Sequence, residues 1–455
     1  MGKSDPTQGN GAAVANRETT GAATAPPAKA RRPRMPFLDG LRGFAALYVV
    51  MNHASIMTMK LVDGATGLNP IFAKILHILH FGVFNYGVYA VDVFIVLSGY
   101  CLMLPVASSA DEQLQGGFFG FMKRRARRII PPYYAALAIC WIFFALAPLL
   151  KIDVAAMSWA SLVQPVFSPG SVLSHLLLIH CWTPYRHAID PPMWSVATEW
   201  NIYFLFPLLL LPVFKRWGSV ATLAIAFGVS ILPHYLGAQS LDSMYPWFLG
   251  LFALGMVGAV LNFSPRPAAR AFAAKAPFGA LAIGFGAVLA VLTTVQKESL
   301  QHNTAVHWLR KETWGSGWPF DIVVGLGAMC LICYCAKTAI AGKSESNALV
   351  RFFDAKPMMQ LGAFSYSLYL FHAPVLEVMW LGLKKTVAPE PSAAIFLLAA
   401  APVSVVTAYL FHLAFEKRFM TSHTKPATAP AAVPGDIVFS GAGEKPKAAA
   451  GDNRA

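Results

Sequence analysis

Two side chains in the apolar stretch Phe37–His53 could take part in chemistry: the guanidinium of Arg42 and the imidazole of His53. Eleven positions in an α-helix amount to three turns plus about 20°, so both side chains project from one face, about 16 Å apart. Arginine binds phosphate and carboxylate groups, and histidine is the most frequent general base. A lone histidine can also be a hydrogen-bonded packing residue, but the arginine on the same face favours a lined cavity.

Two other apolar stretches each carry a carboxylate: Asp92 lies within 83–106 and Glu199 within 193–214. Measured from the predicted outer ends of their helices, His53 and Glu199 lie about 9 Å deep and Asp92 about 14 Å deep. Ionisable groups at such depth usually face the bundle interior or a water-filled cavity. We therefore expect the three groups to form one polar site, although a buried ion-pair network that only fixes packing would show the same pattern.

A basic run precedes the third apolar stretch, in "FMKRRARRIIPPYY". Positive charge beside a membrane helix is often explained by topology and by attraction to anionic lipid. Five cations in the six positions 123–128 could equally hold a phosphorylated ligand. Together with Arg42, the run predicts an anion-binding surface on the cytoplasmic face.

Three further polar side chains lie in the apolar stretches: the hydroxyl of Ser98, the phenol of Tyr369 and the imidazole of His372. Such groups often serve as hydrogen bonds between membrane helices, and they could also contact a substrate. The cysteines at 330, 333 and 335 lie inside an apolar run, where small polarizable side chains suit helix packing. We therefore expect no metal site.

These groups must be positioned by a bundle of membrane helices. Of 455 residues, 56% are apolar and only 13% are charged, whereas roughly a quarter are charged in soluble domains. Apolar runs of about 20 residues, the length that spans a bilayer, recur along the chain. We predict an all-α polytopic membrane protein with about ten transmembrane helices, at residues 38–59, 83–106, 129–150, 193–214, 219–238, 244–262, 277–296, 320–341, 359–383 and 392–415.

Most of the 36 Lys and Arg residues fall in the connections on the side of the N-terminus. Cytoplasmic connections carry the excess of basic residues, so both termini are predicted to be cytoplasmic. This distribution explains the net charge of +14 without nucleic acid as a partner. Residues 1–36 and 419–455 are predicted to be disordered cytoplasmic tails because they are poor in bulky apolar groups.

Five motifs together resemble the membrane acyltransferase-3 family, and they occur in the family's order. The resemblance extends from Phe37 to about Val375, although residues 215–350 contribute only hydropathy. The motifs are "FLDGLRGFAALYVVMNH", "GVYAVDVFIVLSGY", "RRARRIIPPYY", "MWSVATEWNIYFLFP" and "FSYSLYLFHAPV".

The resemblance implies that residues 37–418 form an acyltransferase transmembrane domain, a multi-pass protein of the inner (plasma) membrane. It implies transfer of an acyl group, with acetyl the expected one, from cytoplasmic acyl-CoA to a hydroxyl outside the cytoplasm. The implied acceptor is a glycan such as exopolysaccharide or O-antigen, or a lipid-linked saccharide. Acyl-CoA is then a donor substrate, and no bound cofactor is expected.

The family's basic residue and histidine of the first helix fall on Arg42 and His53. Its RxxR motif falls on Arg125 and Arg128, with Arg124 and Arg127 as a second possible register. The Trp–Ser and Glu of the fourth helix fall on Trp194, Ser195 and Glu199. Where members commonly have Phe–Tyr, this chain has Ile202–Tyr203.

The roles follow as hypotheses. Arg42, Arg125 and Arg128 would hold the anionic head of the donor. His53 would be the general base on the acceptor hydroxyl or, alternatively, a transient acyl carrier. Asp92 or Glu199 would orient the imidazole. Three further side chains would contact the oxyanion or the acceptor, namely Ser98, Tyr369 and His372.

Two other functions fit the same residues. A proton-coupled secondary transporter also places carboxylates and a histidine near mid-membrane. Transporters often show repeat symmetry and paired broken helices, and we find no such pairing in the sequence. A membrane sensor or scaffold would leave the ionisable cluster unexplained.

Overall fold

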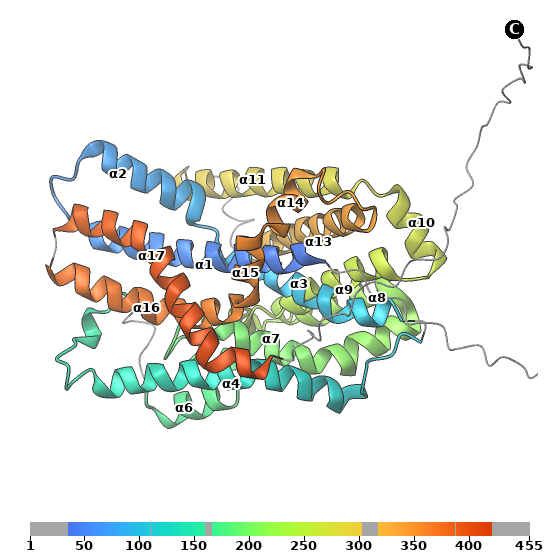
Figure 1. Cartoon of the computed structure of the whole chain (residues 1–455), viewed down its shortest axis with the longest axis horizontal. Coiled ribbons are helices and arrows are strands. Elements are labelled where there is room, and N and C mark those ends of the chain that lie inside the picture. Colours follow the sequence, from blue (N-terminus) through green and yellow to red (C-terminus); the bar gives the residue numbers. More distant parts are fainter. Residues whose placement is uncertain (1–34, 110, 160–165, 303–316, 387, 421–455) are drawn as a thin grey trace, which may run out of the picture.

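The computed structural model describes residues 35–109, 111–159, 166–302, 317–386 and 388–420 (Figure 1). Within these ranges the chain forms helices and turns and no strand, which confirms the predicted all-α class. The tails predicted at 1–36 and 419–455 fall almost entirely outside the described residues. The α-helices are α1 (Pro36–Val62), α2 (Pro70–His77), α3 (Gly87–Ala107), α4 (Gly117–Leu146), α6 (Pro169–Leu176), α7 (Met193–Leu205), α8 (Leu211–Tyr235), α9 (Phe248–Phe263), α10 (Pro267–Lys275), α11 (Phe278–His302), α13 (Trp318–Ile340), α14 (Ala348–Asp354), α15 (Lys356–Ala363), α16 (Ser365–Thr386) and α17 (Pro389–Phe411).

Shorter helical segments of other types connect or extend these helices. π-helical segments follow α2, α7 and α17, and they are η1 (Ile78–Phe84), η4 (Phe206–Leu210) and η7 (His412–Glu416). The 3₁₀ segments are η2 (Val154–Ala156), η3 (His180–Trp182), η5 (Gln239–Met244) and η8 (Lys417–Phe419).

Each of the ten predicted spans overlaps a helix. Seven helical stretches among the described residues are long and apolar enough to cross a membrane, or up to eight if the bent pair α9–α10 is one span. The spans predicted at 193–214 and 219–238 form one helical run, interrupted by the π-helical turn of η4 and by Gly218, whose φ is 81°. The count of ten crossings and the side of the termini remain predictions.

Close backbone contacts hold the bundle together. At Gly99 on α3 an added Cβ would lie 2.0 Å from the carbonyl oxygen of Phe252 on α9. At Gly255 on α9 it would lie 2.0 Å from the carbonyl oxygen of Val96 on α3. Small residues allow membrane helices to approach this closely. Helix α1 lies against α3 on one side and against α15, α16 and α17 on the other.

The bundle has two distinct ends along its long axis, which is horizontal in Figure 1. The start of α1, the end of α3 and the start of α4 lie at one end, which we call the arginine end because Arg42 and the basic run of α4 lie there. The end of α1 and the segment that follows α4 lie at the opposite end.

Candidate active site

The central feature is a pair of histidines from two helices far apart in the sequence. His53 on α1 and His372 on α16 approach so that Nδ1 of His53 lies 2.9 Å from Nε2 of His372. The rings are nearly parallel, with centroids 5.0 Å apart. His372 is fully buried, whereas His53 is half-buried.

The hydrogen bonds of this pair assign its tautomers. Nδ1 of His372 lies 2.8 Å from the carbonyl oxygen of Tyr369 and 3.1 Å from that of Leu368. A carbonyl can only accept, so this nitrogen carries the hydrogen, and Nε2 of the neutral ring holds a lone pair. Nδ1 of His53 must then donate to it. The lone pair of His53 therefore lies on Nε2, for which no hydrogen-bond partner occurs among the described residues.

A cavity of about 110 Å³, here called the arginine-side cavity, leads from the arginine end toward this pair. Arg42 and Arg128 line one part of it and Tyr369 another. The Tyr369 ring lies 5.9 Å from that of His372. Its hydroxyl is 2.6 Å from Oγ of Ser195 and donates to the carbonyl of Pro192 at 3.2 Å. The tyrosine is thus fixed where the cavity approaches the histidines.

Polar contacts inside this cavity pair arginine with sulfur and a carboxylate with hydroxyls. Arg42 donates to Oδ1 of Asp39 and to Sγ of Cys101, both at 2.9 Å. Oε1 of Glu199 accepts hydrogen bonds from Ser98 and, at 2.5 Å, from Tyr203. Glu199 therefore lies in the cavity wall, with hydroxyl partners, whereas the hydrogen-bond partner of His53 is His372.

The helical phase of α4 separates the two arginine registers. Arg125 and Arg128 line the arginine-side cavity and are half-buried. Arg124 and Arg127 are exposed, and Arg124 donates to the carbonyl of Gln115 at 2.7 Å. Nε of Arg125 is buried and has no hydrogen-bond partner among the described residues, so it is available to an anion.

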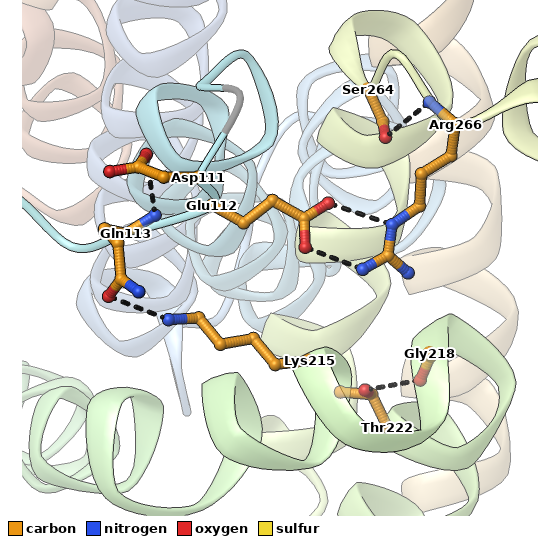
Figure 2. Close-up of polar contacts among 8 residues, drawn as sticks. All are labelled: Asp111, Glu112, Gln113, Lys215, Gly218, Thr222, Ser264 and Arg266. Atoms are coloured by element: carbon orange, nitrogen blue, oxygen red, sulfur yellow. Dashed lines mark hydrogen bonds and ion pairs between the residues drawn. The ribbon is translucent and has the colours of Figure 1, made fainter.

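The loop before α4 is held from two sides, as Figure 2 shows. Arg266 forms a bidentate ion pair with Glu112, at 2.9 and 2.6 Å, and its guanidinium lies 4.5 Å from the ring centroid of Phe214. Lys215 donates to the side chain of Gln113 at 3.0 Å. Bidentate pairs of this kind fix direction as well as distance, so they help to set where α4 begins and which way its arginines face.

Asp92 belongs to a different cluster. It is completely buried, and a side-chain hydrogen bond joins it to Asp321 of α13, which requires a proton on one of the two carboxyl groups. Asp321 accepts a hydrogen bond from Nε1 of Trp247 at 2.6 Å. Asp92 is absent from the lining of the arginine-side cavity. The structure therefore does not bring the predicted three ionisable groups into one contact network.

Sequence reasoning missed Cys101 and Asp321 because neither carries a signal of its own. Cys101 directly follows the motif "GVYAVDVFIVLSGY" in α3, and only folding brings its sulfur to Arg42. Asp321 lies in the first turn of α13, where an acidic residue suits the helix dipole. Among the described residues no group of three or more His, Cys, Asp or Glu side chains is arranged to hold a metal ion.

Comparison with known proteins gives a consistent result. The model of a family described as an acyltransferase domain, acyltransferase-3, matches residues 35–413. The O-acetyltransferase OatA of Staphylococcus aureus is 25% identical over 358 residues, covering 75% of this chain. "Protein 2 in picA locus" of Rhizobium radiobacter is 26% identical over 191 residues, which is 42% of this chain and 85% of that protein. Acyltransferase MdmB of Streptomyces mycarofaciens is 30% identical over 205 residues, which is 42% of this chain and 45% of that protein.

The chain spans about half the length of OatA. No solved structure is significantly similar to it.

Proposed function

The chain belongs to the acyltransferase-3 family, and from this premise we propose that it is an integral-membrane O-acyltransferase. It transfers an acyl group, acetyl in the simplest case, from acyl-CoA to a hydroxyl of an acceptor outside the cytoplasm. The family match along residues 35–413 and the printed names of OatA and MdmB support acyl transfer. The name of OatA specifies an acetyl group transferred to oxygen. A glycan of the cell envelope as the acceptor, and the inner (plasma) membrane as the location, are proposed from the resemblance of the five motifs.

One observation carries the proposal: His53 has a free Nε2 and a tautomer fixed by His372. A general base needs a lone pair on the accessible nitrogen and a partner that holds the other nitrogen as the donor. His372 meets the second requirement without a carboxylate. We therefore assign the orienting role to His372 and keep Glu199 for the donor side of the site.

The donor fits the arginine-side cavity. Acyl-CoA carries several negative charges on its head, which Arg42, Arg125 and Arg128 match in sign. Its long arm can follow the cavity toward Tyr369, which brings the thioester close to the histidine pair. With the N-terminus cytoplasmic, as the positive-inside rule predicts, the arginine end faces the cytoplasmic pool of acyl-CoA.

The reaction then needs one base and one acid. Nε2 of His53 takes the proton of the acceptor hydroxyl while the oxygen attacks the thioester carbonyl carbon. Collapse of the tetrahedral intermediate breaks the carbon–sulfur bond and forms the ester. The CoA thiolate leaves and receives the proton from the imidazolium. Tyr369, held by Ser195 near the histidines, is the hydroxyl group that would stabilise the oxyanion, once its hydrogen turns from the carbonyl of Pro192 to the substrate.

The direct test uses the purified chain and radiolabelled acetyl-CoA in lipid nanodiscs. Intact protein should release CoA and transfer label to an envelope glycan fraction, and His53→Ala should do neither while still binding acetyl-CoA. Normal turnover by His53→Ala would refute the assignment of the base. Transport of acetyl-CoA or of a proton-coupled solute without CoA release would instead favour the transporter.

A further inference from the structure

A second cavity lies on another side of the histidine pair. Its volume is about 330 Å³, and we call it the apolar cavity. It is bounded by α4, α16 and α17 and by the segments at 157–159 and 189–191. Its walls are mostly aliphatic and aromatic, including Ile139, Phe143, Phe371, Val378 and Val403.

This cavity adjoins both histidines. Trp159 lines it, and the Trp159 ring packs edge-on against His53 with centroids 5.5 Å apart. Phe371 and Ala373, which flank His372 in α16, also line it. A ligand in the apolar cavity therefore reaches the neighbours of both imidazoles, whereas the arginine-side cavity approaches the pair through Tyr369.

One wall residue is a carboxyl without a partner. Asp190 is only 2% exposed, and neither of its oxygens has a hydrogen-bond partner among the described residues. Burial raises the pKa of Asp190 well above its usual range and so favours the protonated carboxyl, which can both donate and accept. A buried polar group left unpaired is costly. By contrast, the carboxylate of Glu377 accepts bonds from N and Oγ of Ser158, both at 2.6 Å.

The rim of the cavity faces outward from the bundle. Val378 on α16 is 55% exposed and Val403 on α17 is 37% exposed, although both line the cavity. Helix α17 is among the helices long and apolar enough to cross a membrane. In a bilayer this rim is bordered by hydrocarbon, so an apolar ligand can enter from the membrane.

We propose that the apolar cavity binds the acceptor, and that the acceptor is a hydroxyl compound joined to a hydrocarbon chain, such as a lipid-linked saccharide. The chain lies against α4, α16 and α17, and the hydroxyl end pairs with Asp190 in the wall of the cavity. This inference rests on the proposed function, because an acceptor has meaning only for acyl transfer.

Two observations favour the acceptor over the acyl chain of the donor as the occupant. The donor head fits the arginine-side cavity, so a separate cavity is left for the second substrate. A hydrocarbon acyl chain also has no group that could form a hydrogen bond with Asp190, whereas the acceptor carries a hydroxyl that could.

The test measures binding and needs no turnover. The purified full chain in lipid nanodiscs is photolabelled with a diazirine analogue of dodecanol, and labelled residues are mapped by mass spectrometry. We expect labelling of cavity residues that excess dodecanol reduces at least about tenfold and acetyl-CoA leaves unchanged. Val403→Trp should lower this competable labelling at least about fivefold. The matched control is Val406→Trp, on the same helix, 59% exposed and outside the cavity lining, which should label normally.

A second variant tests the carboxyl. Intact protein should prefer the alcohol probe to the matching methyl ether that cannot donate a hydrogen bond, and Asp190→Leu should abolish the preference. Asp190→Asn should keep part of it. Absence of competable labelling in the cavity would overturn the proposal. Labelling that a long-chain acyl-CoA reduces and dodecanol does not would also overturn it, because that result would assign the cavity to the donor. If labelling behaves as expected but acetyl-CoA is not turned over, the proposed function fails and this binding site stands.

Discussion

The arginine-side cavity has arginine, glutamate and hydroxyl groups in its lining, whereas the apolar cavity is lined mostly by aliphatic and aromatic groups, with the carboxyl groups of Asp190 and Glu377. The first is the smaller, at about 110 Å³ against about 330 Å³. Both approach the same pair of histidines, one beside Tyr369 and the other beside Trp159. This difference is what the proposal of two substrates of opposite polarity, reaching one base from different sides, requires.

The largest effect should come from His53, the proposed base, which both cavities approach through its neighbours. His53→Gln removes the free Nε2 that accepts the hydroxyl proton, so kcat for acyl transfer should fall by about 10²- to 10⁴-fold. Equilibrium binding of acetyl-CoA should change less than about twofold, because His53 lines neither cavity. A parallel loss of donor binding would mean that the histidine supports the fold of the donor side instead.

A smaller loss is expected when the partner of the base is changed. His372→Phe removes the acceptor for Nδ1 of His53 and leaves the ring free to adopt the wrong tautomer, so kcat should fall by about 10- to 100-fold. His372→Gln can still accept that hydrogen bond and should recover part of the activity. Steady-state kinetics check this: a rise in KM for acetyl-CoA without a change in kcat would contradict a positioning role.

The donor side can be weakened without touching the histidines. Arg125→Ala removes a half-buried cation whose Nε has no described partner, and the dissociation constant of acetyl-CoA should rise about 10- to 100-fold. Arg127→Ala, on the exposed face of the same helix, is the matched control and should change it less than about twofold. Labelling of the apolar cavity should be unaffected by either change. Equal effects of both arginines would point to a general surface charge and not to a built site.

The segment next to the apolar cavity should be the more acid-sensitive side. His175 and His180 are buried with rings 4.0 Å apart, and burial lowers the pKa of His175 to about 4 and that of His180 to about 3. In the opened segment both return to a pKa near 6.5 and take up protons first. The contribution of these two histidines to the stability of the closed segment is therefore full above about pH 6.5 and falls below it, by about 1.4 kcal/mol per pH unit for each histidine. Asp190 in the same segment, whose pKa burial raises, acts in the opposite direction and offsets part of this loss.

Hydrogen exchange of residues 166–192 between pH 7 and pH 5, corrected for the intrinsic rate, measures this opening. His180→Phe keeps a flat ring and removes one titrating group, so it should reduce the acid sensitivity by about half. Sensitivity unchanged by this substitution would place its origin elsewhere. The start of α4 should respond little over the same range, because its arginines do not titrate there.

The two sides also differ in how well the sequence predicted them. Arg42 and the basic run before the third span were identified from charge and spacing, and the structure brings Arg42, Arg125 and Arg128 to one cavity. The sequence left open which pair of arginines faces inward, because a choice between registers one residue apart depends on the rotation of α4 about its axis. That rotation is set by packing and by contacts such as Glu112 with Arg266.

The apolar side was missed almost entirely. Asp190 stands in a loop between Ile189 and Pro191 and has no pattern around it that separates a cavity wall from a turn. Trp159 lies in a connection that hydropathy predicts only as extramembrane. Asp92 was correctly recognised as buried in a membrane helix, but its neighbour is Asp321 and not His53. Depth along a helix follows from counting residues, whereas the direction of a side chain around the bundle does not.

By itself, the sequence determined the helical membrane class, the approximate places of the long helices, the basic residues of the arginine end and the family. These follow from local quantities: hydropathy over about 20 residues, the 3.6-residue period and the spacing of short motifs. Only the tertiary structure decided that His372, 319 positions away, is the partner of His53, and that a second, apolar cavity adjoins the pair. Both depend on which faces of α1, α4, α16 and α17 meet, and that is fixed by the packing of the whole bundle.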